Sequence, residues 1–343
     1  MPHLLQSPNV ACNCIMNPQK IISKRNYITA GILFLFGVLF FGTVGIILLI
    51  KASKEIDDGK PIFGTIIPAG MLLSLALYTF YYLLSITPKI TITIEGIEFK
   101  TIFKTNFYYW TEVESIELTG KKPMKFLFAS MPMEATTITL REGYDKLIWT
   151  DNYRNTAIIR RALDTINKQL KINQPLRIIF TEQDKLYSMD TDPLEDNGEV
   201  YKGNFYLSMN GIIIIGWLGL IGFGLVTRPH VFLSNFGAIL SISFATIVFC
   251  GSSINQVYYF IITDQYLYVR NHVLPWINKS IELNKIKEAV IESPGRRSTS
   301  LRIIDKDFNS KIYGAGTLSV KTWKTLLAEL ERRSIPVRLE TEL

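Results

Sequence analysis

Four stretches of the chain contain no charged residue, and each is long enough to cross a lipid bilayer. They run over Tyr27–Ile50, Pro61–Thr87, Phe205–Thr227 and Val231–Thr263. A hydrocarbon core of about 30 Å requires about 20 apolar helical residues. A buried helix of a soluble protein accounts for one such stretch but rarely for four. The pattern therefore predicts an integral membrane protein with four transmembrane helices, paired into two hairpins.

After each hairpin, apolar and polar residues alternate with the period of half-buried strands. Residues Thr93–Lys100 align without a gap with Thr263–Arg270, and Trp110–Leu118 then align with Leu283–Ile291. Each half closes with apolar residues at helical spacing, for which Asn152 and Ser319 are the expected N-caps. The order hairpin, strands and helix occurs twice, which predicts an internal repeat.

The repeat divides the chain into six predicted segments. We expect an N-terminal tail over residues 1–26, a first hairpin over 27–87, a first soluble domain over 88–171, a linker over 172–204, a second hairpin over 205–254 and a second soluble domain over 255–343. The prolines and the acidic run of residues 190–196 indicate the linker. Within it, Leu176–Phe180 predicts an additional strand.

The aligned segments resemble the bacterial membrane-anchored PH-like (pleckstrin-homology-like) domain proteins in a tandem arrangement. Residues Thr263–Arg270 followed by Ile281–Ile291 carry the resemblance, because they are similar to that family's T-D-x-x-L-x-x-R … I-x-L-x-x-I-x-x-V pattern. In the first half, Ile94 stands where the family often has Asp. The resemblance implies two small α+β PH-like barrels, each with a C-terminal helix. It implies no catalytic residue, since the family has no shared catalytic motif.

The sequence offers no constellation typical of an enzyme. It contains no phosphate-binding loop, no dinucleotide-binding glycine pattern and no nucleophile elbow. The histidines and cysteines lack metal-ligand spacing; they are His3, His230, His272, Cys12, Cys14 and Cys250. The four apolar stretches also lack the ionisable residues that proton-coupled transporters place at bilayer depth. We therefore expect no catalytic activity, no cofactor and no metal.

The net charge of +7 narrows the choice of partner. Cations flank the apolar stretches without a nucleic-acid-binding motif, which favours anionic membrane lipid over nucleic acid. The candidate head-group contacts are Lys20, Lys24, Arg25, Lys121, Lys122, Lys125, Arg296 and Arg297. For the two loop clusters, an ordinary solvated turn is the alternative. The positive-inside rule predicts that both soluble domains and both termini face the cytoplasm. The resemblance implies that the membrane of this multi-pass protein is the bacterial cytoplasmic membrane.

Small residues recur every four positions in two of the apolar stretches. They are Gly70 and Ser74 in one, and Gly237, Ser241 and Ala245 in the other. Such rows let helix backbones approach closely in lipid. We expect them to serve helix packing, either within the chain or between copies in a homo-oligomer.

Three functional hypotheses follow from these patterns. The leading one is a non-enzymatic membrane scaffold whose PH-like domains bind a protein partner, another copy of the chain, or lipid head groups. The second is a transporter or export component whose helices form a path. The third is a membrane enzyme acting on lipid, which the missing nucleophile–base set disfavours.

Overall fold

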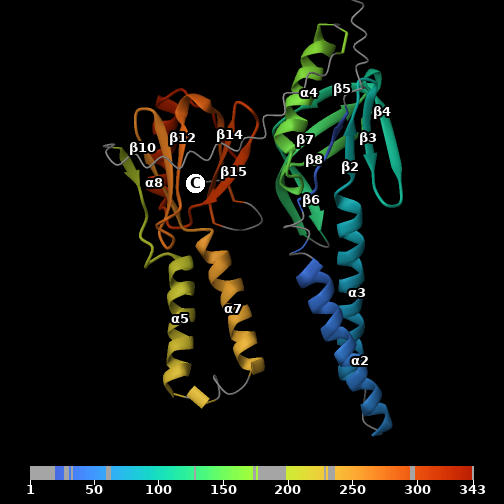
Figure 1. Cartoon of the computed structure of the whole chain (residues 1–343), viewed down its shortest axis with the longest axis vertical. Coiled ribbons are helices and arrows are strands. Elements are labelled where there is room, and N and C mark those ends of the chain that lie inside the picture. The colour runs from blue at the N-terminus through green and yellow to red at the C-terminus, as the bar shows by residue number, and fades with distance from the viewer. Residues whose placement is uncertain are drawn as a thin grey trace, which may run out of the picture. The chain divides into compact units, whose positions relative to one another are not determined.

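The computed structural model describes residues 20–26, 31, 34–58, 63–126, 129–172, 175–176, 198–227, 229–230, 236–293 and 298–341. The chain forms two compact units (Figure 1). Unit 1 consists of Met1–Leu118, Thr136–Asn155 and Ala162–Thr181. Unit 2 consists of Thr119–Ala135, Thr156–Arg161 and Glu182–Leu343. Each unit contains membrane-type helices and antiparallel strands.

Among the residues that the structure describes, three helical stretches are long and apolar enough to cross a membrane. In unit 1 they are Gly37–Ile56 and α3 (Phe63–Ile86), and in unit 2 the stretch is α5 (Met209–Thr227). The first combines the end of a π-helical segment, Phe34–Phe40, with α2 (Phe41–Asp57). Helix α7 (Phe236–Ile254) is the fourth, but its described apolar stretch, Ala245–Ile254, is shorter than a membrane span. Three of the four predicted spans are thus present, and the fourth stays a prediction.

Glycines bring α2 and α3 together in unit 1. A Cβ atom at Gly45 would lie 2.8 Å from Leu73 Cγ, and one at Gly37 would overlap Thr79. Gly70 and Ser74 instead lie exposed on α3, so they do not form this contact. Their packing against another copy stays a prediction. In the other predicted row, Ala245 is half-buried on α7, and the side-chain environments of Gly237 and Ser241 lie outside the described part of the structure.

Unit 2 contains two four-stranded sheets. One has the order β12-β11-β10-β9, with β9 at Glu199–Tyr201, β10 at Tyr258–Ile262, β11 at Tyr266–Asn271 and β12 at Asn278–Glu282. The other has the order β15-β14-β13-β16, with β13 at Ile286–Glu292, β14 at Ser300–Asp305, β15 at Ser310–Gly314 and β16 at Val337–Leu339. Alternate residues of β10 are buried, as the period of two requires.

An amphipathic helix completes the core of unit 2. Helix α8 (Val320–Arg332) buries Trp323, Leu326 and Leu330 in the same apolar cluster as the inward residues of both sheets. Its N-cap is Ser319, whose Oγ accepts a hydrogen bond from the backbone of Thr322, as the sequence predicts.

The strands of unit 1 follow a similar order. One sheet runs β1-β2-β3-β4, with β1 at Ile21–Ile22, β2 at Lys89–Ile92, β3 at Gly96–Lys100 and β4 at Thr105–Tyr109. The other joins β5 (Val113–Glu117) and β8 (Asp145–Trp149) to β7 (Ala129–Leu140). Helix α4 (Thr156–Lys171) follows. The sequence places its N-cap at Asn152, which is wrong, because residues 150–152 form a separate 3-10 turn.

Strand β7 and helix α4 each begin in unit 2 and end in unit 1. The first part of β7 pairs with β6 (Lys121–Phe126), forming a hairpin that belongs to unit 2. The last part of β7 pairs with β5 in unit 1. Two continuous elements therefore connect the units.

The two halves of the sequence have corresponding local geometry. Thr93 and Thr263 each bond through Oγ1 to the backbone of the residue three positions later. A 3-10 turn precedes β5 at Trp110–Glu112 and β13 at Leu283–Lys285. Each of these strands is irregular at its start, between Val113 and Ser115 and between Ile286 and Glu288. These positions are the ones that the sequence alignment pairs.

One sequence-based expectation is not seen in the structure, and another is not tested by it. The strand pairs described leave the two sheets of each half separate, so closed barrels are not present among them. The strand expected at Leu176–Phe180 falls mostly outside the described residues. The structure instead has β9 directly ahead of the second hairpin and β16 after α8, and both are too short for an alternating pattern to reveal.

Candidate functional site

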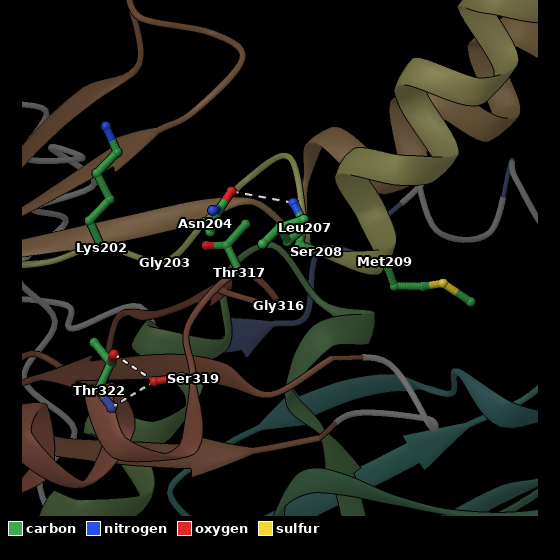
Figure 2. Close-up of a pocket in the computed structure, with 10 residues that line it drawn as sticks. All are labelled: Lys202, Gly203, Asn204, Leu207, Ser208, Met209, Gly316, Thr317, Ser319 and Thr322. Atoms are coloured by element: carbon green, nitrogen blue, oxygen red, sulfur yellow. Dashed lines mark hydrogen bonds between the residues drawn. The ribbon is translucent and has the colours of Figure 1, made fainter.

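A pocket of about 500 Å³ lies in unit 2, where the chain enters α5 and where α8 begins. Figure 2 shows the two segments that form it, one running from Lys202 to Met209 and the other from Gly316 to Thr322. The lining consists of Lys202, Gly203, Asn204, Leu207, Ser208, Met209, Gly316, Thr317, Ser319 and Thr322. Most of these side chains are polar, and Lys202 carries the charge.

Short-range hydrogen bonds fix the segment that leads into α5. Asn204 Oδ1 accepts from the backbone of Leu207 at 3.3 Å, which closes a turn (Figure 2). Ser208 Oγ accepts from the backbone of Gly211 at 3.0 Å, so Ser208 is the N-cap of α5. Because Ser319 caps α8 in the same way, both helices begin at this pocket.

Two glycines allow the two segments to meet. A Cβ atom at Gly203 would overlap the backbone carbonyl group of Thr317. A Cβ atom at Gly316 would lie 2.7 Å from Asn210 Nδ2. Any side chain at either position would therefore push the segments apart and change the shape of the pocket.

The side of the pocket at Lys202 is cationic and aromatic. Lys202 Nζ lies 5.0 Å from the centroid of the Tyr259 ring, and that ring lies 4.9 Å from the ring of His272. His272 Nε2 is 3.3 Å from Thr317 Oγ1. Burial, together with the charge of Lys202, lowers the pKa of His272 to about 4. His272 is therefore neutral near pH 7 and leaves the positive charge to Lys202.

The pocket also lies next to the membrane-type helix. Tyr206, Leu207 and Met209 are exposed apolar residues directly ahead of α5 or in its first turn. Tyrosine is enriched at the level of lipid head groups, where its ring is apolar and its hydroxyl is hydrated. The pocket thus lies beside exposed apolar residues at the start of a helix that is long and apolar enough to cross a membrane.

The depressed pKa of His272 predicts an acid-sensitive fold. Between pH 6.5 and about 4 the unfolded chain binds a proton that the folded chain excludes. The free energy of unfolding therefore decreases as the pH falls through this window. We expect the apparent unfolding temperature of the detergent-solubilised protein to drop from pH 7 to pH 4.5, with a smaller drop in His272→Gln. A drop of equal size in His272→Gln would contradict the assignment, and His230→Gln, at an exposed position, is the control.

The head-group contacts predicted from the sequence do not line this pocket. Lys20 and Lys24 are exposed and Arg25 is half-buried, all ahead of the first hairpin. Lys125 is exposed and Lys122 half-buried on β6. Arg296 and Arg297 lie outside the described residues. These contacts stay predictions.

Lys121 differs from the exposed loop cation that the sequence predicts. Its side chain is almost completely buried in unit 2 and pairs with the buried carboxylate of Glu292. Glu292 also accepts a hydrogen bond from Arg302 Nε at 3.0 Å. The ammonium group of Lys121 is therefore engaged inside the protein.

A second buried carboxylate extends this group of charges. Glu134 is fully buried, and it contacts Arg160 at 3.2 Å and Arg338 at 3.1 Å. Arg338 also bonds to Glu288 at 2.7 Å and to Glu340 at 2.6 Å. Four carboxylates thus face four cations, so the cluster is electrically balanced, as buried charges require. We call these eight residues the buried ion cluster; it joins the β6–β7 hairpin and the first turn of α4 to β13, β14 and β16.

Sequence reasoning missed the pocket because its signals are weak individually. Lys202 precedes the second hairpin much as Lys20 and Lys24 precede the first. Gly203 and Gly316 look like ordinary turn residues until the close approach of their segments is known. Only the fold brings the three residues to one place.

Comparison with known proteins does not assign a function to the pocket or to the buried ion cluster. Among the described residues there is no group of three or more His, Cys, Asp or Glu side chains arranged to hold a metal ion. No protein-family model matches the chain, and no curated protein matches its sequence.

Proposed function

We propose that the chain is a non-enzymatic, multi-pass scaffold protein of a bacterial cytoplasmic membrane, and that its second soluble domain binds an anionic lipid head group. In this proposal α7 is the fourth membrane span, and both sheet-rich domains face the cytoplasm. The three apolar helices and the cations ahead of the first hairpin support this arrangement.

We propose further that the two domains are tandem copies of a PH-like module. The support is the shared local geometry: equivalent threonine turns, equivalent irregular strand starts, and an amphipathic C-terminal helix in each copy. The short strand ahead of each helical hairpin also pairs with the equivalent strand after that hairpin, since β1 pairs with β2 and β9 pairs with β10.

The observation that carries the lipid proposal is the position of Lys202. It is the charged residue of the pocket, and the other polar side chains of the lining present hydroxyl and amide groups. The pocket opens where α5 leaves the soluble domain, beside exposed apolar residues. A phosphate with polar substituents fits this chemistry, because Lys binds phosphate as a point charge and hydroxyl groups complete the hydrogen bonds.

Lipid binding can be measured by native mass spectrometry of the purified full chain in detergent. We expect the wild-type protein to retain phosphatidylglycerol in preference to phosphatidylcholine. Lys202→Ala should weaken phosphatidylglycerol binding by about fivefold, since one cation near anionic lipid contributes ~1 kcal/mol. Lys324→Ala, which removes an exposed cation from α8, is the matched control and should bind as the wild type does.

Two outcomes would contradict the proposal. Equal retention of the two lipids would remove the head-group assignment. Substrate-dependent flux in liposomes that contain only this protein would replace the scaffold with the transporter hypothesis.

A further inference from the structure

The hairpin between β3 and β4 in unit 1 has an apolar tip that nothing in the described structure covers. Ile102 is 61% exposed and Phe103 is 67% exposed. Exposed lysines, Lys100 and Lys104, flank the pair. Backbone and side-chain bonds between Thr101 and Lys104 close the turn, so the tip is held in a defined shape. Two large apolar side chains at the end of a fixed, cation-flanked hairpin are unfavourable in water.

The tip lies alongside the membrane-type helix α3. The ring of Phe103 is 6.1 Å from the ring of Tyr81, centroid to centroid. Tyr81 precedes the last residue of α3, Ile86, by five residues, a distance of about 7.5 Å along the helix axis. Figure 1 shows the β3–β4 hairpin pointing along the direction of α3. The tip therefore reaches past the end of α3 to the level of a residue inside the candidate span.

A hairpin of unit 2 shows the same arrangement independently. The connection between β11 and β12 carries Trp276, which is 76% exposed. At the start of this connection, the ring of His272 stacks on Phe205 at 5.8 Å. Phe205 lies four residues ahead of α5, so this hairpin end is next to the place where the chain enters its membrane-type helix. Asn271 Oδ1 accepts from the backbones of Val273 and Leu274, which fixes the turn.

We infer that both hairpin tips insert into the lipid leaflet beside their own membrane helices. The occupant of each exposed apolar tip is the bilayer itself, because Tyr81 contacts the first tip and Phe205 contacts the start of the connection that carries Trp276. Phe103 and Trp276 enter the region between head groups and acyl chains, where aromatic rings are favoured. Lys100 and Lys104 extend to anionic head groups. The inference rests on α3 and α5 crossing a membrane and does not depend on the Lys202 pocket.

Depth-dependent fluorescence quenching tests this inference on the full chain in nanodiscs. Phe103→Trp places a reporter at the first tip, and lipids brominated along their acyl chains quench emission at that depth. We expect most of the emission that Phe103→Trp adds over the wild type to be lost in brominated nanodiscs. In a separate variant, Trp276→Phe should remove a component that these lipids quench in the wild type.

The matched control is Tyr144→Trp, at an exposed turn at the other end of the same unit. Strand β4 runs from the tip toward Tyr109, and the carbonyl group of Glu112 beyond it accepts a bond from Arg141 in that turn. Emission added by Tyr144→Trp should be quenched by aqueous iodide and not by brominated lipid. If Phe103→Trp and Trp276 behave like this control, the inference is overturned.

Quenching of the native Trp217 on α5 distinguishes a failure of this inference from a failure of the membrane arrangement itself. The emission of Trp217 should be quenched by brominated lipid in every variant. Absence of that quenching would show that α5 does not cross the bilayer, and would overturn both the inference and the proposed function.

Discussion

Glu134→Ala is expected to cost about 3–5 kcal/mol of the free energy of unfolding, because it removes a fully buried carboxylate that pairs with the buried guanidinium group of Arg160 and with Arg338. The carboxylate of Glu134 is fully buried between Arg160 and Arg338 in the buried ion cluster. One of its oxygens also accepts a bond from the backbone of Gly120 at 3.3 Å. Removal of Glu134 thus disrupts two ion pairs and a hydrogen bond to the residue that precedes β6. The measurement is the apparent unfolding temperature of the full chain in one detergent.

The control for this prediction is Glu282→Ala. Glu282 pairs with Lys285 at 2.6 Å, but both side chains are partly exposed, and an exposed pair contributes at most about 1 kcal/mol. Glu134→Gln adds a second comparison, since it keeps the volume and removes the charge. Similar unfolding temperatures for Glu134→Ala and Glu282→Ala would show that the buried ion cluster is not formed in the folded protein.

Trp323→Ala should destabilise unit 2 by about 3–5 kcal/mol, the usual cost of removing a large buried aromatic side chain. Trp323 is almost completely buried and packs 6.1 Å from the ring of Phe260. It lies one turn after Ser319 and directly after Thr322, both of which line the pocket. Loosening of α8 should therefore also weaken phosphatidylglycerol binding, even though Trp323 does not line the pocket.

Trp323→Phe keeps a smaller aromatic ring at this position. We expect this variant to retain most of the stability and the lipid binding. Lys324→Ala, the next residue on the exposed side of α8, should leave both unchanged. If Trp323→Ala lowers the unfolding temperature and leaves lipid binding intact, the start of α8 does not shape the site.

The parts of the fold that depend on local periodicity could be predicted from the sequence. The charge-free stretches predict α3 and α5 because bilayer thickness fixes the length of a spanning helix. The amphipathic pattern and the N-cap of α8 follow from Ser319 and the spacing of Trp323, Leu326 and Leu330. Both signals are contained within about 20 neighbouring residues.

The parts that depend on long-range contacts could not be predicted. Lys121 looks like a surface cation in the sequence, and only the fold brings it to Glu292, 171 positions away along the chain. The same holds for Glu134 and Arg338, which are separated by 204 positions. The site at Lys202 also requires Gly203 to meet Thr317. Charge and composition alone do not distinguish a buried partner from a solvated residue.

The β6–β7 hairpin and the first turn of α4 belong to the first half of the sequence but to the second structural unit. A fragment that begins after residue 181 would lack Lys121 and Glu134, and so would remove from Glu292 and from Arg338 one of the partners that each has in the full chain. We therefore expect the second half, expressed alone, to be less stable than the full chain. Its buried ion cluster is built from both halves of the sequence, although it lies within one structural unit.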